Sequence, residues 1–151
     1  MSWKDVLLKE LEYKGSIVSS ISNVPNVDIP EGFDRLEKYH ITLLSGQQLK
    51  PMKEQGLSNK EMKETIKTFI SNFPLSPKVV FGESAIASRN DGRQTLFFSA
   101  KNQGELQTYL DSITDALKIP KVKRFFHVSV ANNQGGNPFK SIGDINEGDI
   151  L

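Results

Sequence analysis

The segment RFFHVSVA at residues 124–131 shares its pattern with YHITLL at residues 39–44. Each places histidine directly after an aromatic residue, and then a β-branched, a hydroxyl and an aliphatic residue. Runs of this kind are typical of β-strands, because β-branched and aromatic side chains fit the pleated backbone. We therefore expect two strands that carry the same motif.

Side chains in a strand alternate between its two faces, so residues two apart share a face. His40 then lies beside Thr42, and His127 lies beside Ser129. We expect this imidazole and hydroxyl face to be a non-core face on both strands. The opposite face is apolar and should lie in the core, as should the aromatic residues that precede the histidines: Ile41, Leu43, Val128, Val130, Tyr39 and Phe126.

The other elements follow from hydrophobic spacing and from turn residues. Helices are predicted at residues 2–11, 58–73 and 102–117, a strand at 16–22, and a hairpin from the runs 79–88 and 93–100. Ser58 and Glu61 match a capping box. Residues 23–37 and 47–57 are predicted to be loop, and residues 132–151 mostly loop. This order predicts an α+β fold with antiparallel sheet and helices on its outer faces.

Composition narrows the functional classes. The chain has 151 residues, which suits a single domain over 1–151. It has no cysteine, and 19 basic residues stand against 18 acidic ones. Disulfides and cysteine-based metal sites are excluded, and a long nucleic acid duplex is not expected as a partner. The charged N-terminal pattern does not predict a secretory signal, and no stretch is apolar enough for a membrane span. We expect a cytoplasmic protein, and the charge balance is compatible with a small anionic ligand held by a few placed groups.

The two motifs contain both histidines of the chain. Imidazole titrates near neutral pH, so such a pair can supply a general base and a general acid. Hydroxyls beside it can donate hydrogen bonds to phosphate oxygens. Both histidines falling in this frame by accident is about a 2% event at ordinary serine and threonine frequencies. The pattern therefore favours a phosphate-directed active site that needs neither metal nor cofactor.

With these paired motifs, HITL at 40–43 and HVSV at 127–130, the sequence resembles the 2H phosphoesterase superfamily over residues 15–131. The resemblance implies a bilobal fold with a central cleft, in which each lobe supplies one motif strand. It also implies a metal-independent phosphodiesterase, with His40 and His127 as the acid–base pair and Thr42 and Ser129 as phosphate ligands. Members cleave cyclic oligonucleotide signals, 2′,3′-cyclic phosphates or 2′–5′ oligoadenylates. The small size looks most like compact phage anti-CBASS nucleases, which act in the host cytoplasm.

Additional substrate contacts are expected from Lys123 and Arg124, in the basic run before the second motif, and from Trp3 and Tyr13, which can stack on a base. A solvated charge run and ordinary packing of these aromatic residues are the alternatives. The Gly-rich residues 132–138 can present backbone N–H groups to a phosphate or act as a lid.

Arg89 and Arg93 flank the predicted hairpin loop and are expected to face solvent. Two other functions stay open. One is a non-catalytic nucleotide- or RNA-binding module, and the other is a metal site that uses both histidines. The sequence leaves the oligomeric state undetermined.

Overall fold

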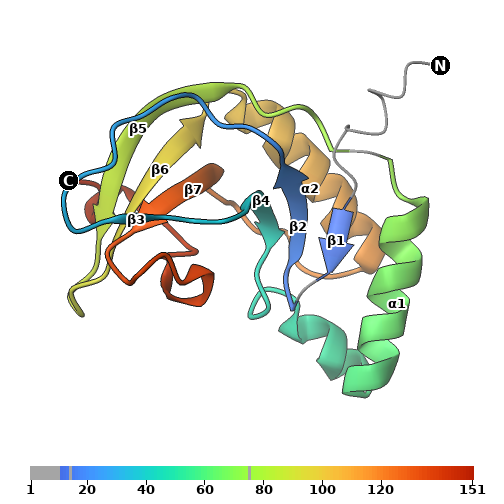
Figure 1. Cartoon of the computed structure of the whole chain (residues 1–151). Helices are drawn as coiled ribbons and strands as arrows, with labels where there is room; N and C mark the ends of the chain where they lie inside the picture. The colour runs from blue at the N-terminus through green and yellow to red at the C-terminus, as the bar shows by residue number, and fades with distance from the viewer. Residues whose placement is uncertain (1–10, 14, 75) are drawn as a thin grey trace. The chain divides into compact units, whose positions relative to one another are not determined.

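The computed structural model describes residues 11–13, 15–74 and 76–151 and is mixed α+β (Figure 1). Within these residues the strands pair in antiparallel orientation. The strands are β1 (Leu11–Tyr13), β2 (Ile17–Ile21), β3 (Asp34–Arg35), β4 (Tyr39–Leu44), β5 (Phe81–Ser88), β6 (Gln94–Ala100) and β7 (His127–Asn132). The helices are α1 (Asn59–Asn72) and α2 (Gln103–Leu117), with 3-10 turns η2 (Lys50–Gln55), η3 (Pro138–Lys140) and η4 (Glu147–Asp149).

Most predicted elements are confirmed, among them both motif strands, the hairpin and the second and third predicted helices. Four details differ. The predicted loop 47–57 contains the 3-10 turn η2, which ends at Gly56 in the left-handed backbone region. Leu11, placed at the end of the first predicted helix, begins strand β1, while residues 2–10 lie outside the described part of the chain. The predicted loop 23–37 contains the short strand β3. Strand β7 begins at His127, three residues later than predicted.

The chain forms two compact units, each built from three separate segments. Unit 1 takes the segment that ends at Ser20, then Thr42–Lys78 and Gly104–Arg124. Unit 2 takes Ile21–Ile41, Val79–Gln103 and Phe125–Leu151. Strand β4 is shared, because the boundary falls between Ile41 and Thr42.

In unit 1, β1 pairs with β2 and α1 packs against β1. Helix α1 begins at the predicted capping box: the Glu61 backbone N–H donates to Ser58 Oγ, and the Ser58 N–H donates to the Glu61 carboxylate. A second contact joins the two helices through aromatic rings. Phe73 lies 5.6 Å from Tyr109 of α2, and the Tyr109 hydroxyl donates to the Pro74 carbonyl.

In unit 2, strands β7, β6 and β5 lie side by side, and β4 and β3 both pair with β7 (Figure 1). A core cluster forms where the C-terminal segment meets the β5–β6 hairpin. Its residues are Ala87, Phe97, Ile142 and Ile145, with Ala85, Phe125 and Ile150 packed against them. The predicted loop at the C-terminus is therefore part of the core of this unit.

Tyr109 makes the stability of unit 1 sensitive to alkaline pH. Burial raises the pKa of Tyr109 from 10.0 to about 12. Between these values the tyrosine ionises in the unfolded chain first, so the free energy of unfolding falls as the pH rises. Urea unfolding from pH 8 to 12 should show a shallower alkaline decline for Tyr109→Phe than for the wild type. Parallel profiles would mean that this phenol ionises equally in both states.

Candidate functional site

The two motif strands are neighbours in unit 2. Ile41 of β4 pairs with Val128 of β7, and both side chains are buried. In an antiparallel pair, this register places His40 across from Ser129. His127 is then the diagonal neighbour of His40 on the same face, at a backbone separation of about 7–8 Å. One register pair thus brings together residues that lie 87 positions apart.

The faces of the two strands divide largely as predicted. The four aliphatic residues of the apolar face and Phe126 are buried, which confirms their place in the core: Ile41, Leu43, Val128, Val130 and Phe126. Tyr39 is only half-buried, and its hydroxyl accepts a hydrogen bond from Arg35 Nη1 at 3.0 Å. On the motif face His40 is exposed and Ser129 is half-buried.

His127 departs from the expectation of a non-core face, because it is only 6% exposed. Its ring stacks on Phe125 at 6.2 Å and meets the edge of Phe97 at 5.6 Å. The reason is strand β6, which pairs with the other side of β7 and places Phe97 opposite Ser129. These two aromatic contacts restrict the orientation of the imidazole.

Gln103 fixes the backbone on which His127 stands. Its side-chain amide brackets Phe126: Oε1 accepts from the Phe126 N–H at 2.8 Å, and Nε2 donates to the Phe126 carbonyl at 2.7 Å. The same Nε2 donates to the Ala100 carbonyl at 2.8 Å. His127 Nδ1 lies 3.4 Å from the Phe125 carbonyl oxygen. Position and orientation of the imidazole are therefore set by groups of unit 2.

Thr42, the other motif hydroxyl, belongs to unit 1, where its side chain is half-buried. Both histidines and Ser129 belong to unit 2, so this division of the chain does not assign one motif strand to each unit.

Arg124 has a different environment from the one expected of a substrate contact. It is 8% exposed, and its guanidinium donates to the Thr42 carbonyl at 2.9 Å and to Gln48 Oε1 at 3.2 Å. These bonds lie inside unit 1, where they fix the backbone of β4 at the motif hydroxyl. Sequence reasoning missed this role, because a basic run gives no sign of which member turns inward.

The other predicted substrate contacts are placed as follows. Lys123 is exposed, and Tyr13 is a half-buried residue of β1 in unit 1. Trp3 lies outside the described residues.

Arg124→Lys tests the structural role of this arginine. Lysine lacks the planar fork, so it cannot reproduce the two buried charge-assisted hydrogen bonds to Thr42 O and Gln48 Oε1. We expect a loss of about 1–3 kcal/mol in the free energy of unfolding. The neighbouring exposed Lys123→Ala should change it by less than about 0.5 kcal/mol. A stable Arg124→Lys protein with weakened nucleotide binding would instead make Arg124 a substrate ligand.

The Gly-rich loop after β7 is organised by a single buried side chain. Asn132 Oδ1 accepts from the backbone N–H groups of Gln134 and Gly136, each at 2.9 Å. Its Nδ2 donates to the Asn137 carbonyl and to Ser141 Oγ. A phosphate cradle built from the Gln134 and Gly136 N–H groups is therefore wrong, because Asn132 already occupies them.

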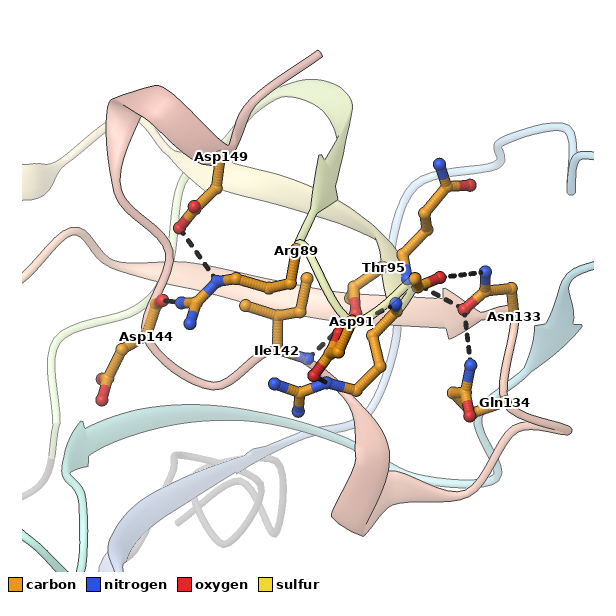
Figure 2. A network of polar contacts seen from close by, with 11 residues as sticks. Arg89, Asp91, Thr95, Asn133, Gln134, Ile142, Asp144 and Asp149 are labelled. Atoms are coloured by element: carbon orange, nitrogen blue, oxygen red, sulfur yellow. Dashed lines mark hydrogen bonds and ion pairs between the residues drawn. The ribbon is translucent and has the colours of Figure 1, made fainter.

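Polar contacts join the remainder of the C-terminal segment to the β5–β6 hairpin (Figure 2). Arg89 pairs with Asp149 at 3.2 Å and donates to the Asp144 carbonyl. The Ile142 N–H donates to the buried Thr95 hydroxyl at 3.0 Å. The prediction that Arg89 faces solvent is thus wrong, because the C-terminal segment folds back onto it. The isoleucines in this otherwise polar segment were the sequence signal that it packs against the rest of the unit.

Arg93 stays at the hairpin loop and pairs with Asp91 at 2.7 Å. Hydrogen bonds from the Arg93 backbone and side chain, with its charge, hold the pKa of Asp91 below its ordinary value. This contact is local to the turn.

Asn132→Ala should unfold the C-terminal segment before the sheet. The change leaves two N–H groups, a carbonyl and a hydroxyl without their buried partner, which should cost about 2–4 kcal/mol. Urea unfolding measures the total loss, and amide exchange locates it in residues 133–151. Asn146→Ala, in an exposed position of the same segment, is the matched control. Equal losses in the two variants would contradict the role given to Asn132.

No protein-family model, curated protein or solved structure matches the chain. Among the described residues, no helix has the length and apolarity that a bilayer span requires. The same residues contain no group of three or more histidine, aspartate or glutamate side chains placed to hold a metal ion.

Proposed function

We propose that this chain is a metal-independent phosphodiesterase that cleaves small nucleotide substrates, with His40 and His127 as its acid–base pair. The observation that supports this most is the pairing of Ile41 with Val128. It brings the two histidines and Ser129 to one face of neighbouring strands, where a single bound phosphate can reach all three.

The bilobal fold of the 2H phosphoesterases is part of this proposal. The mixed α+β architecture supports it, with seven strands in an antiparallel sheet and two α-helices within the described residues. Cytoplasmic location belongs to the same proposal. Among substrates, cyclic oligonucleotide signals of the kind that phage anti-CBASS nucleases cleave come first. RNA-end 2′,3′-cyclic phosphates and 2′–5′ oligoadenylates follow.

The proposed reaction begins with a ribose hydroxyl next to the scissile phosphate. One histidine removes its proton while the oxygen attacks phosphorus. The bond from phosphorus to the leaving oxygen breaks, and the other histidine protonates that oxygen. This gives a cyclic phosphate, which water opens with the two roles reversed. Hydrogen bonds from Ser129 to the phosphate oxygens offset the charge that develops.

The setting of His127 supports a defined proton path. A proton on Nδ1 points to the Phe125 carbonyl, 3.4 Å away. In that tautomer the lone pair is on Nε2, which is the nitrogen that we propose exchanges a proton with the substrate. His40 is exposed to solvent, unlike His127.

The experiment is a turnover assay in EDTA with 2′,3′-cyclic AMP, 2′–5′ oligoadenylate, and cyclic di- and trinucleotides. His40→Ala should lower kcat by about 10²–10⁴-fold, the usual contribution of a positioned acid or base. His127→Phe should do the same while keeping the packing on Phe97 and Phe125. Ser129→Ala should cost about 10²-fold in kcat.

Thr65→Ala, on the exposed surface of α1, is the control for loss of a hydroxyl. Full activity in a folded His127→Phe protein would refute the acid–base assignment. Activity that EDTA abolishes would point to the metal site instead.

The burial of His127 favours one alternative, a nucleotide-binding module without catalysis, in which this imidazole serves packing alone. That module would bind a member of the panel tightly and turn none of it over. Its affinity for that nucleotide would be unchanged in the His127→Phe variant.

A further inference from the structure

Unit 1 contains a cavity of about 580 Å³ that the motif residues do not line. Its volume falls within the range of about 300–1,000 Å³ that is usual for small-molecule sites. Residues from β1, η2, α1 and two turns surround it: Tyr13, Gly15, Gly46, Lys53, Met62 and Lys63. Asn59, the first residue of α1, completes the lining.

The charge of this cavity is positive. Lys53 comes from η2 and Lys63 from α1, and both side chains are exposed. The lining described for the cavity includes no carboxylate. Lysine ammonium groups bind phosphate as point charges, and two of them facing one cavity favour an anion there.

The lining also includes two largely apolar side chains. Tyr13 contributes a half-buried phenol ring, and Met62 is a buried thioether. An aromatic ring beside a cationic groove is a stacking platform for a nucleobase. The Asn59 side-chain amide carries both a donor and an acceptor, which suits the polar edge of a base.

Two glycines allow the backbones of two turns to approach closely at one wall of the cavity. The turns after β1 and after β4 meet here, and a Cβ on Gly46 would lie 2.8 Å from the Gly15 carbonyl oxygen. Ser45 and Gln48 hold the second turn through reciprocal hydrogen bonds between side chain and backbone, at 3.0 and 3.2 Å. Arg124 donates to the same Gln48. The wall is thus built from fixed backbone rather than from movable side chains.

We propose that this cavity binds a mononucleotide, with the phosphate between Lys53 and Lys63 and the base against Tyr13. The site goes beyond the proposed phosphodiesterase activity, because it uses none of the motif residues and lies within unit 1. Inorganic phosphate can contact only the two lysines, and a nucleoside can contact only the Tyr13 ring. The intact nucleotide is expected to bind more tightly than either part.

Titration of the full-length protein with AMP, inorganic phosphate and adenosine, followed by amide chemical shifts, tests the site. AMP should shift the amides of Lys53, Met62 and Lys63 in wild type and in a His40→Ala/His127→Ala protein alike. Lys53→Glu and Lys63→Glu should each weaken AMP binding by about tenfold or more, as expected for loss of a charge-assisted contact. Lys67→Glu, one turn further along α1, is the matched control and should change the affinity less than about twofold.

Tyr13→Leu and Tyr13→Phe separate stacking from the phenol hydroxyl, with the melting temperature of each variant as the check on folding. Leucine should weaken AMP binding and leave phosphate binding unchanged, while phenylalanine should preserve both. Three results would overturn the proposal: shifts confined to Ser129 and its neighbours, equal affinity for phosphate and AMP, or equal losses in Lys63→Glu and Lys67→Glu.

Discussion

The single antiparallel pairing of Ile41 with Val128 organises the motif face of this protein. Because both side chains are buried, a shift of one residue would turn an apolar side chain outward and a histidine inward. The hydrophobic effect therefore fixes the register, and the register in turn fixes which polar groups face each other. His40 and Ser129 are neighbours because Ile41 and Val128 belong in the core.

The C-terminal segment contacts the sheet of unit 2 near the motif face at two places. Phe97 lies opposite Ser129 and is covered by Ile142 and Ile145 of the C-terminal segment. Asn132, at the end of the motif strand itself, ties down the loop that starts this segment. The order of the C-terminal segment is thus coupled to the strand that carries His127. This coupling joins the packing of unit 2 to the geometry of the candidate site.

Local sequence signals predicted much of this structure. The capping box at Ser58, the hairpin turn at residues 90–92 and the alternation in both motif strands each depend on neighbouring residues. The errors arise where distant segments meet. Arg89 is half-covered because Asp149 returns to it, and His127 is buried because β6 brings Phe97 beside it. No pattern within either segment contains that information.

The aromatic packing of His127 bears on both functions proposed for the motif face. A general acid or base must hold its ring within a fraction of an ångström, and stacking on Phe125 with an edge contact to Phe97 supplies that restraint. The same packing would also serve an imidazole with no chemical duty. What separates the two cases is Ser129 and His40, which packing alone does not require on that face. Their convergence beside a restrained imidazole is the stronger reason to look for chemistry there.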